Sequence, residues 1–230
     1  MSLIRENKVI NKFTLLLLSG LLIFCSGMAQ AEEHAQEQAQ NENPYVMLED
    51  VATKTFNRIK KERQLIEENP ELLRKVMEEE LLPYVDYNFS ALKVLGKHYK
   101  KVPREKIPEY ISVFRSYLIT TYALAMAYYD GQDVEFQPVR EVTDERTVTV
   151  RAVVKESGRP DINLAFKLRK NRKTNEWKAY DMVAEGISLL SSKQSEFQSI
   201  LRKDGIQKVI DLMNNTINRP INIDVQKKEG

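Results

Sequence analysis

Two carboxylates, Asp181 and Glu185, are the side chains whose type and spacing could best support a reaction. They lie in the segment YDMVAEG, at the end of an expected strand. A carboxylate pair can act as general acid and general base when the two environments shift the pKa values apart. The structural alternative, which we favour, is that Asp181 satisfies backbone or cationic partners and that Glu185 helps to turn the chain.

Histidine and cysteine are too scarce for most other kinds of site. The chain contains two histidines and one cysteine. His34 lies in a polar leader, and His98 lies among lysines in GKHYKK, a context that favours a surface residue at a helix end. A zinc site needs several ligands at defined spacing, and a catalytic triad needs a nucleophile motif beside its histidine. Neither pattern occurs, nor does a glycine-rich phosphate loop. We therefore expect no metal, no cofactor and no catalytic residues.

The first 31 residues have the pattern of a cleavable signal peptide. Basic residues precede the apolar run 13–24, and Ala29-Gln30-Ala31 is a small-x-small cleavage pattern. The run is shorter than the about 20 residues that a membrane-spanning helix needs. A lipoprotein signal acylated at Cys25 is the alternative, but the bulky Phe24 precedes that cysteine. We therefore expect cleavage after Ala31 and a periplasmic location.

The expected mature chain has no net charge. The whole sequence carries 35 basic and 33 acidic residues, and removal of Arg5, Lys8, Lys12 and Glu6 with the signal peptide leaves 32 of each. Nucleic-acid binding relies on an excess of Lys and Arg that displaces counterions. No nucleic-acid partner is therefore predicted. Cleavage would also remove the single cysteine, and with it any disulfide or thiolate chemistry.

A folded domain is expected between two polar segments. The leader 32–43 and the tail 217–230 contain few apolar residues, so both are expected to be loose. The domain between them spans 44–216 and begins with segments whose apolar residues recur at helical spacing. Four helices are predicted from this spacing, over 44–66, 70–81, 87–98 and 103–129.

The apolar period then changes from helical to alternating. Four segments alternate as strands do, at 134–136, 148–154, 162–168 and 176–184. Short polar turns join the later strands, so they are expected to be antiparallel neighbours. Helices over 190–203 and 206–215 close the chain, with Gly205 in the left-handed conformation between them. This order predicts an α+β fold, with helices around a curved antiparallel sheet, NTF2-like or cystatin-like, and an additional helical subdomain. Nothing in the pattern demands more than a monomer.

The end of the fourth helix, YLITTYALAMAYYD (117–130), is apolar around almost its whole circumference. Such a helix must be covered on all sides, by more core, by another protein or by an apolar ligand. Three alanines in this segment would leave room beside it, which favours a cavity. Ligand cavities are mainly apolar with a few polar groups at the mouth, a role that Tyr180, Asp181 and Ser188 could fill.

Helix and strand phase select the residues expected to line this cavity. Ile187 follows the Glu185-Gly186 turn and is the candidate for its mouth, so Ile187→Glu is expected to abolish retention of the ligand without unfolding the chain. The full set of expected lining residues is Leu95, Tyr99, Phe114, Tyr117, Leu118, Tyr122, Met126, Val150, Leu164, Phe166, Met182, Ile187 and Leu189.

Three stretches of the chain together resemble the MlaC family, the periplasmic phospholipid-binding component of the Mla intermembrane lipid transport system. They are LLPYVDYNFSALKVLGKHYKK (81–101), FRSYLITTYALAMAYYDG (114–131) and WKAYDMVAEGISLLSSKQSEFQSILRKDGI (177–206). The last is the most specific, since Tyr-Asp-x-x-x-Glu-Gly-x-Ser after a strand tryptophan is uncommon. Some relatives have Tyr-Arg where this chain has Lys193 and Gln194.

The resemblance implies a carrier that holds the acyl chains of a phospholipid in an apolar cavity, with no cofactor. It also implies partners: MlaA in an outer-membrane complex and MlaD in the inner-membrane transporter, between which lipid would move to maintain outer-membrane asymmetry. Two alternatives stay open from the residues themselves. One is an NTF2-like small-molecule enzyme that uses Asp181 and Glu185, and the other is a periplasmic adaptor without a ligand.

Overall fold

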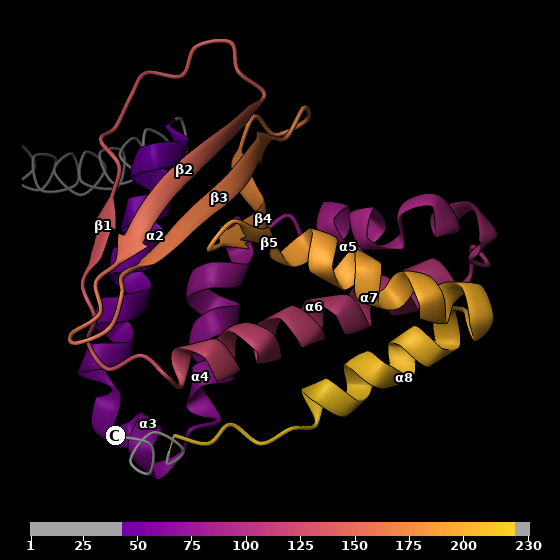
Figure 1. The fold of residues 1–230 in the computed structure, drawn as a ribbon, viewed down its shortest axis with the longest axis horizontal. Coiled ribbons are helices and arrows are strands. Elements are labelled where there is room, and N and C mark those ends of the chain that lie inside the picture. The colour runs from indigo at the N-terminus through magenta and orange to yellow at the C-terminus, as the bar shows by residue number, and fades with distance from the viewer. Residues whose placement is uncertain (1–42, 224–230) are drawn as a thin grey trace, which may run out of the picture. The chain divides into compact units, whose positions relative to one another are not determined.

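Helix α2 (Pro44–Lys61) is the first helix among the described residues and lies along one face of a β-sheet (Figure 1). It begins at Pro44 because the Asn43 side chain accepts a hydrogen bond from the Tyr45 amide, while proline at the first helical position needs no donor. The computed structural model describes residues 43–223. The expected signal peptide at 1–31 and most of the expected leader lie outside the described residues.

A run of short helices follows α2. The single helix expected over 44–66 is interrupted at Glu62, and α3 (Arg63–Glu68) continues after it. Next, α4 (Leu72–Val76) passes into the π-helical turn η1 (Met77–Leu81) and the 3₁₀ turn η2 (Leu82–Tyr84). A π-helical turn takes up extra residues and so rotates the side chains that follow it relative to a regular α-helix.

Two helices then form the middle of the helical region. Asp86 caps α5 (Tyr87–Leu95) through the Phe89 amide, and the 3₁₀ segment η3 (Gly96–Lys101) follows. The long helix α6 (Lys106–Met126) packs against α4, α5 and the last described helix, α8 (Gly205–Ile217). The predicted helix over 103–129 is therefore confirmed, although α6 is three residues shorter at each end.

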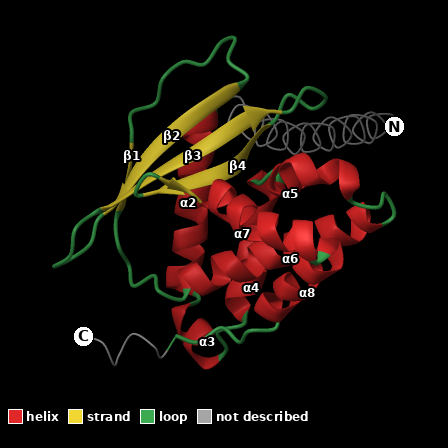
Figure 2. Ribbon diagram, turned by 45° about the vertical axis from the view of Figure 1, so that its right-hand side comes forward, coloured by secondary structure: helices red, strands yellow, loops and turns green. Residues whose placement is uncertain are grey.

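The alternating segments form one antiparallel sheet in which every strand pairs with its neighbour in sequence (Figure 2). Its register places Val150 opposite Phe166 and Phe166 opposite Met182, on one face. A bulge at Tyr180 shifts the pairing of the third and fourth strands. The strands are β1 (Val134–Phe136), β2 (Thr147–Val154), β3 (Ile162–Lys170), β4 (Trp177–Ala184) and β5 (Ile187–Ser188).

Helices α7 (Leu189–Lys203) and α8 (Gly205–Ile217) complete the fold, joined as predicted through Gly205 with φ of 78°. The expectation of a loose tail from residue 217 is wrong for the part that the structure describes. Ile221 is 3% exposed, and its amide donates to the Glu71 carboxylate. A single isoleucine in a polar segment gave too weak a periodic signal to reveal this docking.

Buried apolar side chains form three clusters. One lies among α5, α6, α7 and α8, a second where α2, α3, α4 and η1 meet the end of α6, and a third between α2 and the sheet. The α+β class, with helices packed on an antiparallel sheet, is thus confirmed. Within residues 43–223, no helix combines the length and the apolar character needed to cross a bilayer.

Candidate apolar binding site

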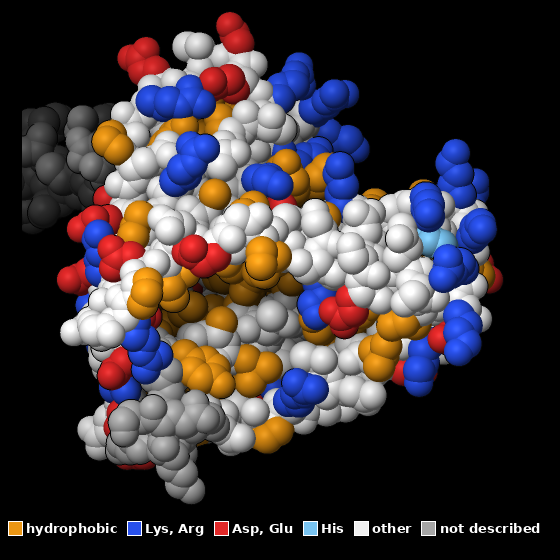
Figure 3. All heavy atoms as spheres, viewed as in Figure 1, with side chains coloured by type: hydrophobic (Ala, Val, Ile, Leu, Met, Phe, Trp, Pro, Cys, Tyr) orange, Lys and Arg blue, Asp and Glu red, His pale blue; other side chains and the backbone are white. Residues whose placement is uncertain are grey.

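A hollow with hydrophobic walls opens between the sheet and α6. Figure 3 shows it as a recess lined largely by hydrophobic side chains, below β5 and the start of α7 and above α6. Helix α6 packs extensively against other helices, whereas no strand in the described residues is among its extensive contacts. The space between these two elements is therefore not closed by direct packing, and their facing side chains form its walls.

The sheet wall is apolar because its strands alternate. Leu164, Phe166 and Met182 share one face, as the paired register shows, and all three are only half-buried. On the same face, Val150 and Leu168 are fully covered by α2. The covered part of this face is core, and the half-buried part is left to face the hollow. Three of the expected lining residues thus lie together here.

On the second half of α6, the expected lining residues Leu118, Tyr122 and Met126 are half-buried. Burial, together with the negative charge of Asp181 on β4, raises the pKa of Tyr122 to about 12. Tyr122 therefore lies deep among protein atoms, yet part of its side chain stays accessible.

Leu81 is a wall residue that the sequence did not identify. It is half-buried and packs against both the cluster at the end of α6 and the cluster beneath the sheet. It therefore lies between these two clusters, next to the end of α6 and to the sheet. Leu81 is the last residue of the π-helical turn η1, which changes the helical phase along this segment. A regular 3.6-residue period could not have placed Leu81 there.

Asp181 organises the polar edge of the hollow. Its side chain is buried, and it accepts hydrogen bonds from the Ser188 hydroxyl at 2.8 Å and the Leu190 amide at 3.1 Å. The Lys167 ammonium donates to it at 3.0 Å from the neighbouring strand. These bonds tie β3 and β4 to the start of α7, where Ser188 also caps the helix through the Ser191 amide.

Glu185 occupies the tight turn between β4 and β5, with φ of 48°. Its carboxylate accepts a hydrogen bond from the Asn163 amide, and its own amide donates to the Asn163 carbonyl at 2.9 Å. Both carboxylates of the expected acid–base pair are thus engaged by the fold. This geometry matches the structural alternative for the two residues and gives no support to their use as acid and base.

Several expected lining residues lie elsewhere. Leu95, Phe114 and Tyr117 are buried among α5, α7 and α8, and Val150 is buried against α2. Tyr99 is 46% exposed on η3. These five do not border the hollow in this structure, because helical phase alone does not tell a face covered by protein from one that is left open. Ile187 and Leu189 are exposed beside the polar edge.

His98 also differs from its expected place. The sequence indicated a surface residue, but the side chain is 6% exposed and its Nε2 atom has no hydrogen-bond partner in the described residues. The lysines around it are exposed, and they gave the segment its polar character. No group of three or more His, Cys, Asp or Glu side chains within residues 43–223 could hold a metal ion.

Comparisons with known proteins agree on one family. The family model described as MlaC protein matches residues 49–215. The intermembrane phospholipid transport system binding protein MlaC of Haemophilus influenzae is 33% identical over 180 residues, which cover 78% of this chain and 84% of that protein. A phospholipid-binding protein from Ralstonia solanacearum, solved in complex with a phospholipid, has the same fold. Its TM-score is 0.67 at 22% identity, over 76% of this chain and 97% of its own.

Proposed function

We propose, from the premise that this chain belongs to the MlaC family, that it binds a phospholipid by its acyl chains and carries it across the periplasm. The observation that carries this proposal is the hollow between the sheet and α6, whose half-buried walls are apolar on both sides. Apolar area left without protein cover in a folded domain is an expected feature of a site for an apolar ligand.

The energetics favour such a carrier. Burial of one CH₂ group is worth about 0.8 kcal/mol, so exposure of two long acyl chains to water would cost more than roughly 20 kcal/mol. A free phospholipid therefore crosses an aqueous gap very slowly. A hydrocarbon-like hollow needs only to match the bilayer environment, so the free energy of lipid transfer between membrane and carrier is close to zero. The headgroup can stay near the surface, because the chains supply most of the driving force.

The name of the Haemophilus influenzae relative indicates where this transport would take place. A binding protein of an intermembrane transport system acts between two membranes, which fits the signal-peptide pattern at 1–31. We propose that this chain exchanges lipid with an MlaA-containing complex in the outer membrane and with MlaD in the inner-membrane transporter. Its role would then be to maintain the lipid asymmetry of the outer membrane.

Eight of the expected lining residues form the proposed contact with the acyl chains. They are half-buried on the two walls or exposed beside the polar edge, and Leu81 joins them at the back. The eight residues are Leu118, Tyr122, Met126, Leu164, Phe166, Met182, Ile187 and Leu189.

We propose that no cofactor takes part and that the chain catalyses no reaction. The two candidate carboxylates, Asp181 and Glu185, are engaged in hydrogen bonds at the start of α7 and in the β4–β5 turn.

Native mass spectrometry of the chain, exported by its host and purified without detergent, tests this function. We expect a mass increment that matches one phospholipid, together with phospholipid in a solvent extract of the same sample. An empty protein whose turnover of a small molecule is lost in Asp181→Asn would instead support the enzyme. An empty, inert protein that still binds membrane complexes would support the adaptor, and either result would contradict the carrier.

A further inference from the structure

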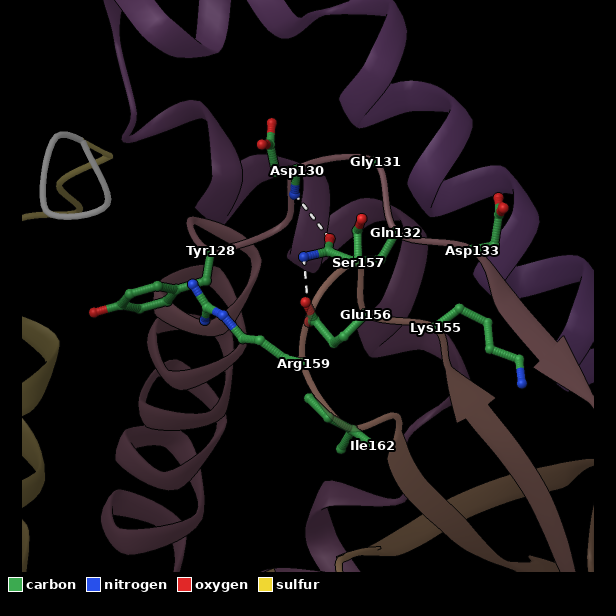
Figure 4. A pocket seen from close by; sticks show the side chains of 10 residues that line it. All are labelled: Tyr128, Asp130, Gly131, Gln132, Asp133, Lys155, Glu156, Ser157, Arg159 and Ile162. Carbon is green, nitrogen blue, oxygen red and sulfur yellow. Dashed lines mark hydrogen bonds between the residues drawn. The ribbon is translucent and has the colours of Figure 1, made fainter. Parts of the chain in front are cut away.

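A recess of about 700 Å³ lies between the segment that follows α6 and the turn that joins β2 to β3 (Figure 4). Tyr128 and Ile162 belong to its lining. Tyr128 lies two residues beyond α6, and Ile162 begins β3 on the same sheet face as Leu164. The recess thus lies next to the end of α6 and the start of β3, the two elements that approach the hollow, although most of its lining comes from the loop after α6 and the β2–β3 turn.

The recess contains charged groups that the fold leaves unpaired. Arg159 is exposed in the β2–β3 turn and has no ion pair or hydrogen bond within residues 43–223. Glu156 has no ion pair in that part of the chain and accepts only from the Gln132 amide, at 3.3 Å. Lys155, by contrast, is neutralised by Asp161 at 2.9 Å and Glu135 at 3.4 Å.

The unpaired cation and anion point in different directions. In Figure 4, the Arg159 side chain extends toward Tyr128, while the Glu156 carboxylate is directed toward Gln132. Only two residues separate them in the sequence, yet they do not pair with each other. The recess therefore presents a positive and a negative group at separate places in its lining, which also includes the half-exposed Tyr128 and the partly exposed Ile162.

This arrangement is complementary to a zwitterion attached to an apolar body. We propose that the recess binds the phosphoethanolamine headgroup of the carried lipid, an inference that rests on the proposed function. A guanidinium binds phosphate oxygens through paired, charge-assisted hydrogen bonds, and the Tyr128 hydroxyl can donate a further one. The ammonium group donates to the Glu156 carboxylate, and Ile162 contacts the start of the acyl region.

The same groups discriminate against an anionic headgroup. Phosphoglycerol offers a phosphate to Arg159 but no cation to Glu156, and the carboxylate of the neighbouring Asp133, also without an ion pair in the described residues, repels it. Because these side chains are largely exposed, solvent screening limits the difference in binding free energy between the two headgroups to that of a surface ion pair. We expect a preference of about two- to fivefold for phosphoethanolamine over phosphoglycerol.

Competitive loading of the full chain tests this inference. Lipid-free protein is incubated with vesicles that contain equal amounts of phosphatidylethanolamine and phosphatidylglycerol with identical acyl chains, and the bound lipid is quantified by mass spectrometry. Glu156→Gln should lower the bound ethanolamine-to-glycerol ratio about two- to fivefold and leave total lipid unchanged. Arg159→Gln should lower the retention of both lipids. Glu141→Gln and Arg172→Gln, which alter exposed charges outside the recess, are the matched controls.

The outcomes separate the recess from the function itself. Wild-type protein that carries phospholipid, with a ratio unaffected by Glu156→Gln and retention unaffected by Arg159→Gln, overturns the headgroup site but leaves the carrier standing. Wild-type protein that takes up no phospholipid overturns both. Tight binding of glycerophosphoethanolamine, which has no acyl chains, would assign the recess to a soluble ligand and also overturn the inference. Circular dichroism spectra check that each variant is folded.

Discussion

Single side chains divide into those whose role the local sequence determines and those whose role depends on distant neighbours. Glu185 belongs to the first group, because a Glu-Gly pair between two strands indicates a tight turn, and Glu185 lies in such a turn with φ of 48°. His98 belongs to the second. Its neighbours in sequence are polar and exposed, but its own ring is covered. A window of adjacent residues cannot reveal that cover.

Ile187 gives the residue-scale prediction. It is 61% exposed beside the polar edge, so Ile187→Glu removes little buried area and should leave the melting temperature unchanged. A charge at this position would have to lie against the apolar part of an entering lipid, which is costly. We expect strongly reduced lipid retention in native mass spectra. Leu65→Glu alters an equally exposed leucine on α3 and should retain lipid as the wild type does. Equal occupancy in both variants would remove Ile187 from the site.

At the scale of elements, the strands were predictable and the walls of the hollow were not. Alternation identified β2, β3 and β4 and their antiparallel pairing, because one face of the sheet is buried against α2. On α6, however, Phe114 is buried by other helices while Tyr122 borders the hollow, and both are aromatic residues in an apolar helix. Which side stays uncovered depends on where other elements pack, and this information is not local.

The junction of β4 with α7 gives a prediction at this scale. Asp181→Ala removes the acceptor for Leu190, Ser188 and Lys167, and it should destabilise the chain by about 2 kcal/mol. Urea unfolding followed by circular dichroism measures the change. Asp161→Ala, which removes an exposed ion pair with Lys155, should cost much less. Equal stability of the two variants would show that Asp181 does not hold α7 on the sheet.

At the scale of the molecule, the buried side chains form three separate clusters, and a hollow remains between the sheet and α6. The clusters hold α2 against the sheet and the helices against one another, while α6 and the sheet remain apart. The order of helices, strands and helices predicted this α+β arrangement. From the sequence alone, an apolar ligand was only one of several possible covers for the apolar end of α6. The choice among them depends on how the elements are arranged in space.

Photo-crosslinking from the acyl chain tests this account most directly. A phospholipid with a diazirine in the middle of one chain is loaded into the protein, irradiated, and mapped by peptide mass spectrometry. Crosslinks should fall on the two walls of the hollow, at Tyr122 on α6 and at Phe166 and Met182 on the sheet. Crosslinks restricted to exposed apolar side chains elsewhere, such as Leu65 and Tyr99, would contradict an interior site for the acyl chains.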